Sequence, residues 1–351
     1  MKAVVIREFG GPGVLRLEDV PDPVPGPGDV VVQVYAVSVN RVLDVAMRNG
    51  EQRHRGVTLP LIPGVDPSGV IVAVGDGVED RAEGDRVAVL HRIRCGQCDA
   101  CVSGDREACS NRRMVGLHRD GGDAELIRIP AESTLPIPDD LGFPEATVIS
   151  RHAPTAYKLL VHMADVQPGD DVLVMGAGGN LGSLGVQIAK MRGARVIAAA
   201  GSAGRVRLGT ELGADVGVDY SVSDLTEAVL DATGGRGVDV VYDNIANPTT
   251  LPKAVAAMAR HGRLVTAGAH GGPFVTLDFG IIYDRQLTIM GGVGARLADY
   301  APCFEAAARG DLKAQVGRIM PLRDIALAHR LTETCPDLGK VILDPTLDGD
   351  N

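Results

Sequence analysis

Val172-Leu-Val-Met-Gly-Ala-Gly-Gly-Asn-Leu-Gly182 joins an apolar run to a glycine-rich turn, and a helix-like segment follows. Gly176, Gly179 and Gly182 recur at every third position. Glycines with this spacing allow a sharp strand-to-helix turn and let backbone N–H groups approach a pyrophosphate. The N-terminus of the helix adds unpaired N–H donors and a partial positive charge. The stretch therefore predicts a dinucleotide-binding turn, with an ordinary tight turn as the alternative.

Short apolar runs alternate with helix-length segments on both sides of this turn, from about residue 147 to about residue 290. The predicted strands are Val172–Met175, Arg195–Ala200, Val216–Asp219, Val238–Asp243, Arg263–Ala267 and Leu287–Met290. The segments between them carry helix-forming residues, as in Leu184–Met191 and Leu251–Ala259. This alternation predicts an α/β fold with a parallel, doubly wound sheet and helices on both faces.

The end of the second predicted strand indicates which dinucleotide binds. An NAD site usually has an acidic residue there, about 20 residues after the turn, to bind the ribose hydroxyl. This chain has Ala199-Ala200-Gly201-Ser202, followed by Arg205 and Arg207, so a 2′-phosphate meets donors and no carboxylate. NADPH is the predicted cofactor; the alternative is that both arginines lie on a solvated helix face. The predicted contacts are Gly176, Gly179, Asn180, Leu181, Gly182, Ser202, Arg205, Tyr220 and Asn244.

Four of the six cysteines lie close together. Cys95, Cys98, Cys101 and Cys109 have the spacing C-x2-C-x2-C-x7-C. One loop with this spacing can supply four thiolates to a tetrahedral zinc ion, and four sulfur ligands leave no open coordination position. The pattern predicts one structural zinc ion per chain. An iron–sulfur cluster, which prefers a shorter last spacing, and free thiols are the alternatives.

The first 150 residues have a different pattern of apolar and turn-forming residues. Short strands such as Val30–Val34, Gly69–Val74 and Arg86–Leu90 are separated by clusters of proline and glycine, which is typical of an irregular all-β unit. The tail has one helical stretch, Tyr300–Ala308, and a late strand, Gly339–Leu343, which we expect to return to the first domain.

Composition limits the possible partners. The formal net charge is −10, which argues against nucleic acid or an anionic membrane surface as the main partner. The N-terminal apolar stretch is too short for a signal peptide, and no window reaches the length of a membrane span. We therefore expect a cytoplasmic protein that acts on a small molecule and has no disulfide framework.

Taken together, these features resemble the medium-chain dehydrogenase/reductase superfamily. Motifs that carry the resemblance are Gly64-x-Asp66-x-x-Gly69 with Val74-Gly75, Gly84-Asp85-Arg86-Val87, Asp120-Gly121-Gly122 with Ala124-Glu125, Thr155-Ala156-Tyr157, the cysteine cluster and the glycine-rich turn. The resemblance implies a chaperonin-10-like catalytic domain (residues 1–152 and 292–351, with a zinc lobe at 91–112) and a Rossmann domain (residues 153–291). It also implies a homodimer or homotetramer.

Zinc alcohol dehydrogenases of this superfamily hold a catalytic zinc ion with three ligands. The first stands three residues before an aspartate, where this chain has Arg41 before Asp44. The second is the histidine of Gly-His-Glu, replaced by Val65, and the third position, six residues before Tyr157, is Arg151. Valine has no ligand atom and arginine has no acceptor, so we expect no catalytic zinc.

The zinc-free centre resembles the quinone oxidoreductase and enoyl reductase branches, which often have Asn-x-x-Asp. Here Asn40 and Asp44 are one residue further apart. The predicted catalytic residues are Asn40, Arg41, Asp44, His152 and Tyr157. Each has a structural alternative: an ion pair between Arg41 and Asp44, a cap or surface role for His152, and helix packing for Tyr157.

The expected reaction follows from the missing Lewis acid. Without a metal, nothing lowers the pKa of an alcohol before hydride leaves. An α,β-unsaturated carbonyl compound spreads the developing charge onto its own oxygen, and the protein needs only hydrogen-bond donors. We therefore expect an NADPH-dependent reductase of such a compound or of a quinone. The alternatives are a zinc-free carbonyl reductase or alcohol dehydrogenase, and an NADPH-binding protein without activity.

Overall fold

The computed structural model describes residues 1–104, 108–334 and 338–348. They form two compact units. Unit 1 comprises Met1–Arg151 and the tail from Gln315, and unit 2 comprises His152–Ala314. Cys335 lies outside the described residues.

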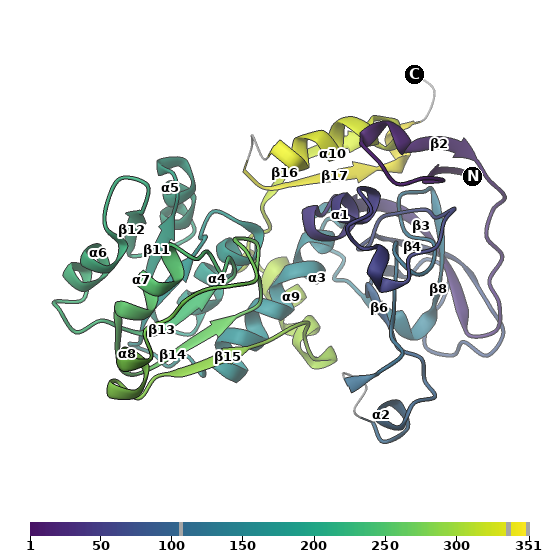
Figure 1. Ribbon diagram of the computed structural model, residues 1–351. Coiled ribbons are helices and arrows are strands. Elements are labelled where there is room, and N and C mark those ends of the chain that lie inside the picture. Colours follow the sequence, from purple (N-terminus) through teal and green to yellow (C-terminus); the bar gives the residue numbers. More distant parts are fainter. Residues whose placement is uncertain (105–107, 335–337, 349–351) are drawn as a thin grey trace. The chain divides into compact units, whose positions relative to one another are not determined.

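Unit 2 contains the predicted parallel sheet (Figure 1). The strands are β10 (Asp171–Met175), β11 (Arg195–Ala200), β12 (Val216–Asp219), β13 (Val238–Asp243), β14 (Met258–Thr266) and β15 (Thr288–Gly291). Their order in the sheet is β12-β11-β10-β13-β14-β15, and every neighbouring pair is parallel. The order reverses after β10, which is the doubly wound arrangement, so the prediction of a Rossmann sheet is confirmed.

Helices follow these strands along the chain, and all but the last of them connect two strands of the sheet. They are α4 (Asn180–Met191), α5 (Ala203–Glu211), α6 (Leu225–Ala232), α7 (Thr250–Ala256), α8 (Phe279–Asp284) and α9 (Tyr300–Ala308). A further helix, α3 (Phe143–Tyr157), crosses the boundary between the units along the chain and continues as a π-helix, Lys158–Met163. In the described part of the chain, no helix is long and apolar enough to cross a membrane.

The glycine-rich turn follows β10 directly. Gly176 has φ +66°, a conformation that side chains with a Cβ rarely adopt. A Cβ on Gly182 would lie 2.1 Å from the carbonyl oxygen of Gly176. Both glycines are therefore required by the turn, one by its backbone conformation and one by the close approach of helix and strand.

Unit 1 is the predicted β-rich domain. Its strands are β1 (Lys2–Val5), β2 (Arg16–Asp19), β3 (Asp29–Ser38), β4 (Ser68–Val74), β5 (Arg86–Val89), β6 (Arg92–Ile93), β7 (Arg113–Met114), β8 (Leu126–Pro130), β9 (Thr134–Pro136), β16 (Val316–Pro321) and β17 (Lys340–Asp344). The main sheet has the order β16-β17-β3-β4-β5-β9, and β8 also pairs with β3. Its helices are α1 (Ala46–Arg48), α2 (Asp99–Val102) and α10 (Ile325–Thr334). Since β17 pairs with β3, the tail does return to the first domain.

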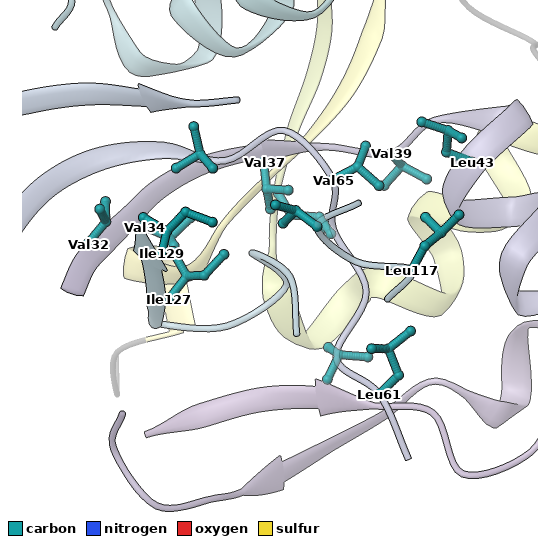
Figure 2. Packing of buried hydrophobic residues seen from close by; sticks show 14 of the residues in the cluster. Val32, Val34, Val37, Val39, Leu43, Leu61, Val65, Leu117, Ile127 and Ile129 are labelled. Atoms are coloured by element: carbon teal, nitrogen blue, oxygen red, sulfur yellow. The ribbon is translucent and has the colours of Figure 1, made fainter. Parts of the chain in front are cut away.

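The core of unit 1 is built from aliphatic side chains. Figure 2 shows Val65 together with Val37 and Val39 in this cluster, and all three are almost fully buried. Leu43, which follows the end of β3, belongs to the same cluster. The core therefore extends to the end of β3, where the candidate catalytic residues begin.

Two boundaries differ from the sequence-based expectation. Leu251–Ala259 was expected to be helical, but α7 ends at Ala256 and β14 begins at Met258. Alanine and methionine favour helices, and here pairing with β13 overrides that preference. Residues 292–314, expected in the first domain, group with unit 2 instead.

Candidate functional site

The glycine-rich turn presents the N-terminus of α4. Gly179 is the N-cap residue of this helix, with an extended backbone, and its N–H group donates to the carbonyl of Gly176. Asn180 and Leu181 form the first turn of α4, where backbone N–H groups have no partner within the helix. This end of α4 has the geometry and the partial charge that bind a phosphate group.

Three further residues that were predicted to bind the cofactor lie next to this turn. Ser202 is the N-cap residue of α5, and Arg205 lies in the first turn of that helix. A Cβ on Gly178 would lie 2.4 Å from the Cβ of Arg205, so Arg205 packs directly over the turn. Tyr220 follows β12, and its ring lies near Gly201. Burial raises the pKa of Tyr220, and the nearby charge of Arg205 opposes this rise.

The two arginines of α5 have different surroundings. Arg207 is 75% exposed and lies 3.5 Å from Glu211, which is an ordinary surface ion pair. Arg205 is also exposed, and it has no hydrogen-bond or ion-pair partner among the described residues. Both arginines therefore lie on an exposed helix face, and Arg205 differs from Arg207 in packing over the turn and in lacking a partner among the described residues.

Asn244 supports the other side of the turn. Its Nδ2 atom donates to the carbonyl oxygen of Met175, the last residue of β10, over 2.9 Å. Asn244 is almost fully buried. The structure thus brings all nine predicted cofactor residues to the carboxyl ends of β10, β11, β12 and β13, which is where open α/β sheets bind ligands.

The four clustered cysteines converge in unit 1. Their sulfur atoms all lie within 4.8 Å of one another, and the Sγ atoms of Cys95 and Cys109 are 3.6 Å apart. Tetrahedral zinc with bonds of about 2.3 Å requires sulfur atoms roughly 3.8 Å apart. Backbone N–H groups of Cys101 and Ser110 lower the pKa of Cys98 to about 6, which favours the thiolate. Cys95, Cys98, Cys101 and Cys109 therefore fit a structural zinc ion, which would hold this lobe together.

Asn40 and Asp66 belong to a buried polar network at the end of β3. Asp66 accepts hydrogen bonds from the backbone N–H and hydroxyl of Ser38, at 3.0 and 2.7 Å, and from Nδ2 of Asn40, at 3.0 Å. The Oδ1 atom of Asn40 accepts a hydrogen bond from Nζ of Lys340. The amide of Asn40 is thus fully engaged with protein groups, and its role here is to connect the network.

Asp44 is buried beside this network. Its two oxygens accept hydrogen bonds from the backbone N–H groups of Asn40, at 2.8 Å, and Gly64, at 3.3 Å. Burial and the charge of Asp66 raise the pKa of Asp44 to about 6. Burial, Asp44 and Asp66 also hold the pKa of Asp123 well above its usual range. Three carboxyl groups therefore share a region in which full ionisation is costly.

The longer spacing between Asn40 and Asp44 is taken up by the backbone. Arg41–Val45 form a π-helical turn, in which the N–H of Val45 donates to the carbonyl of Asn40. A π-helical turn accommodates one residue more than an α-helical turn. Asn40 and Asp44 therefore remain in contact despite the extra residue.

The three positions that correspond to catalytic zinc ligands carry unsuitable side chains. Arg41 is exposed, and Asp44 uses backbone donors instead of an ion pair with it. Val65 has no exposed surface and packs in the aliphatic core. Arg151 is half-buried in α3. Among the described residues, one group of three or more potential metal ligands lies close together, and this group is the four cysteines.

His152 and Tyr157 belong to unit 2. Both lie in α3 and are half-buried. The ring of Tyr157 meets the ring of His162 edge-on, with centroids 5.4 Å apart, and Nε2 of His162 lies 2.9 Å from Asp299. This contact agrees with the packing alternative for Tyr157. The catalytic roles of these two residues remain predictions.

Sequence reasoning missed three buried polar residues of unit 1, Lys340, Asp123 and His91. Lys340 is 300 positions from its partner Asn40, and Asp123 stands next to the Asp120-Gly121-Gly122 motif without any ligand-like spacing. His91 is 7% exposed and follows β5. The available signal for the last two was position alone: Asp123 directly follows the Asp120-Gly121-Gly122 motif, and His91 directly follows the predicted strand Arg86–Leu90.

Comparison with known proteins identifies two family models. The "Alcohol dehydrogenase GroES-like domain" model matches residues 26–139, and the "Zinc-binding dehydrogenase" model matches residues 180–309. An NAD-dependent alcohol dehydrogenase of Sulfolobus acidocaldarius is 31% identical, over 92% of this chain and 94% of its own length. Human quinone oxidoreductase is 29% identical, over 98% of this chain and 97% of its own length.

Solved structures agree with these matches. A crystal structure of an NAD-dependent alcohol dehydrogenase superposes with a TM-score of 0.90 and 39% identity, covering 98% of this chain and 99% of the other. The fold, the glycine-rich turn and the cysteine cluster thus agree with both family models. The chain belongs to the medium-chain dehydrogenase/reductase superfamily of nicotinamide-dependent oxidoreductases, as a zinc-binding dehydrogenase with a GroES-like domain.

Proposed function

We propose that this protein is an NADPH-dependent carbonyl reductase or alcohol dehydrogenase that works without a catalytic zinc ion. The observation that carries the proposal is the set of side chains where zinc enzymes hold their catalytic metal. Val65 is a core residue, and Arg41 and Arg151 are permanently charged cations. A metal cation there would meet positive charge instead of ligands.

A bound nicotinamide cofactor would supply the hydride, and the protein would bind, orient and polarise the substrate. The relatives include alcohol dehydrogenases, which favours carbonyl and alcohol chemistry over the reduction of a conjugated C=C bond. For a carbonyl group the oxygen takes on the negative charge directly, so cationic donors in the site lower the barrier most. Arginine is such a donor at any physiological pH.

Reduction of a conjugated C=C bond is the second candidate. The match to quinone oxidoreductase over 98% of this chain favours it. The Asn40–Asp44 pair also supports it, since the π-helical turn keeps these residues in contact as in the shorter Asn-x-x-Asp pattern.

The preference for NADPH rests on Arg205. It lies over the phosphate-binding turn and has no partner among the described residues, and β11 ends without an acidic residue. The guanidinium of Arg205 would donate a charge-assisted hydrogen bond to a 2′-phosphate. Because some relatives are named as NAD-dependent, the preference for NADPH over NADH has to be measured on this chain.

A matched substrate pair tests the reaction. NADPH absorbance is followed with a saturated ketone and with the corresponding α,β-unsaturated ketone, and NADH serves as the control. We expect the saturated ketone to be turned over at least as fast as the unsaturated one. Turnover of the unsaturated ketone alone would overturn the proposal in favour of the second candidate. Failure with both would leave a nucleotide-binding protein.

We also propose a homodimer or homotetramer that assembles through β15. This strand is at the edge of its sheet, and Ile289 on it is 42% exposed. Phe279 and Tyr283 of the neighbouring α8 are 75% and 78% exposed. An unpaired edge strand beside exposed aromatic side chains is suited to pairing with a second copy. The remaining partner is a small-molecule substrate.

A further inference from the structure

Unit 1 has a cavity of about 390 Å³, within the size range of pockets that hold small organic molecules. Its wall includes Arg113 of β7, Arg128 of β8 and Arg119 of the loop between these strands. The described residues that line it all belong to unit 1 and include none of the predicted catalytic, cofactor or zinc-binding residues. A ligand in this cavity would therefore occupy a separate site.

One wall of the cavity is apolar. Ile62, Ile93 and Ile127 line it, and each is at most 7% exposed. Ile93 and Ile127 belong to the aliphatic core of unit 1, in which Figure 2 labels Ile127. Because these side chains are held by the core, they offer a fixed surface that can bury the apolar part of a ligand.

Arg119 is a half-buried cation in the same cavity. Its Nη2 atom donates to the carbonyl oxygen of Arg128 over 2.7 Å, and the guanidinium has no ion-pair partner among the described residues. Burial lowers the pKa of Arg119, and the attraction of Asp29 and Asp120 does not reverse this shift. A guanidinium that has lost part of its hydration without gaining an ion pair favours binding of an anion.

Two other cations at the cavity are already neutralised. Nε of Arg128 lies 3.4 Å from the carboxylate of Asp29. The N-terminal ammonium of Met1 lies 2.6 Å from the carboxylate of Asp22. Neither pair adds net charge to the cavity.

Arg113, Arg119 and Asp120 are the remaining charged residues of the wall. Arg113 is exposed, and its side chain has no hydrogen-bond or ion-pair partner among the described residues. One oxygen of Asp120 accepts a hydrogen bond from the backbone N–H of Ile62 over 3.0 Å. Two guanidinium groups thus face one carboxylate, and the cavity keeps one uncompensated positive charge in a chain whose formal net charge is −10.

We propose that this cavity binds a small organic monoanion, namely a carboxylate with an apolar body. The guanidinium groups of Arg119 and Arg113 would donate to the carboxylate, whose two oxygens match their planar fork. A single negative charge balances the uncompensated positive charge, whereas a phosphate ester would bring nearly two. The apolar body would lie against the isoleucines of the wall. The site does not rest on the proposed function, because binding needs no hydride transfer.

Calorimetry with matched probes tests both parts of the ligand. Hexanoate has the charge and the apolar body, hexanol lacks the charge, and acetate lacks the apolar body. We expect the wild type to bind hexanoate at least about 10-fold more tightly than either control, and hexyl phosphate no more tightly than hexanoate. Equal binding of hexanol, tighter binding of hexyl phosphate or no binding of hexanoate would overturn the inference.

A charge-removing variant tests the role of the arginines. Arg119→Met should weaken hexanoate binding by about 10- to 100-fold and leave hexanol unchanged, because the lost hydrogen bonds involve a charged group. Arg309→Met is the matched control, since Arg309 is an exposed arginine of unit 2 that pairs with Asp311. Undiminished hexanoate binding by a folded Arg119→Met would place the ligand elsewhere and overturn the inference.

Two further measurements apply even if Arg119→Met fails to fold. Arg113→Met removes a side chain without a partner among the described residues, and it should weaken hexanoate binding by roughly 10-fold. Phenylglyoxal labelling of the wild type with peptide mass spectrometry should show that hexanoate protects Arg113 and Arg119 and not Arg309. Protection of neither would overturn the inference. Hexanoate binding without hydride transfer to any ketone would overturn the proposed function alone.

Discussion

Arg205 is the residue on which the choice of cofactor depends. Replacing it by glutamine removes the charge that we expect to bind the 2′-phosphate. Arg205→Gln should lower kcat/KM for NADPH by roughly 10- to 100-fold and leave NADH nearly unchanged, because NADH has no group to lose the contact. Arg207→Gln is the matched control, since Arg207 pairs with Glu211 on the surface. Equal losses with both cofactors would show that Arg205 only packs over the turn.

Asp44 gives the buried network a pH dependence. Its pKa is raised from the ordinary 3.8 to about 6, so the folded protein binds a proton more tightly than the unfolded chain. Asp44 therefore stabilises the folded protein fully below pH 3.8. This contribution to the free energy of unfolding, on the order of 3 kcal/mol, is lost as the pH rises to about 6.

Urea unfolding of the wild type and Asp44→Asn between pH 4 and pH 7 measures this effect. The advantage of the wild type over the variant should shrink as the pH rises, because asparagine does not ionise. An advantage that stays constant or grows over this range would mean that Asp44 is stabilised in its ionised form.

Single residues were predictable from the sequence where a motif marks them. The glycine-rich turn made Ser202 and Arg205 identifiable as its neighbours, because turn and strand ends have fixed spacings. It did not mark Ile245, whose side chain packs against the first glycine of the turn. His91 and Lys340 carry no such mark. Their importance comes from long-range packing, as in the contact of Lys340 with a residue 300 positions away.

At the scale of elements, the π-helical turn Arg41–Val45 explains the unusual spacing of Asn40 and Asp44. Deleting Val42, which is 46% exposed, should convert this turn to an α-helical one and keep Asn40 next to Asp44. We expect the free energy of unfolding to change by less than about 1 kcal/mol, as for other exposed positions. Deleting Leu43 instead, which is 6% exposed, should cost about 2–4 kcal/mol because it removes a core side chain. Similar losses in the two deletions would contradict this view.

The strands were predictable because their apolar runs have the right length. All six strands of unit 2 lie where the sequence indicates, within one residue at either end, except that β14 begins five residues before its predicted start. Helix ends were less predictable, since the residues after Ala256 favour a helix but pair with β13 instead. No sequence pattern predicted the π-helical turn, which is recognised by its hydrogen bonds.

At the scale of the whole molecule, the edge strand β15 should set the oligomeric state. Ile289→Lys places a charge on the edge and should hinder pairing with a second copy. Light scattering with size-exclusion chromatography should give a mass at least twice 36.6 kDa for the wild type and at most half of the wild-type mass for the variant. A wild-type mass of one chain would contradict the proposed assembly.

The order of domains along the chain was predictable because the motifs occur in sequence and the late strand returns to β3. The assignment of residues 292–314 was not, because α9 has a helical pattern that fits either unit. Whole-chain similarity is also uneven as a guide, since relatives that match nearly all of the chain include both an alcohol dehydrogenase and a quinone oxidoreductase. Reaction type therefore depends on a few side chains that overall similarity does not reveal.

Zinc content measured together with turnover shows whether the protein works without a catalytic zinc ion. Mass spectrometry of the metals in the purified protein is compared with its rate of NADPH oxidation by a carbonyl compound, before and after addition of zinc. We expect one zinc ion per chain, held by Cys95, Cys98, Cys101 and Cys109, and full activity at that content. Activity that appears only when a second zinc ion binds would contradict it.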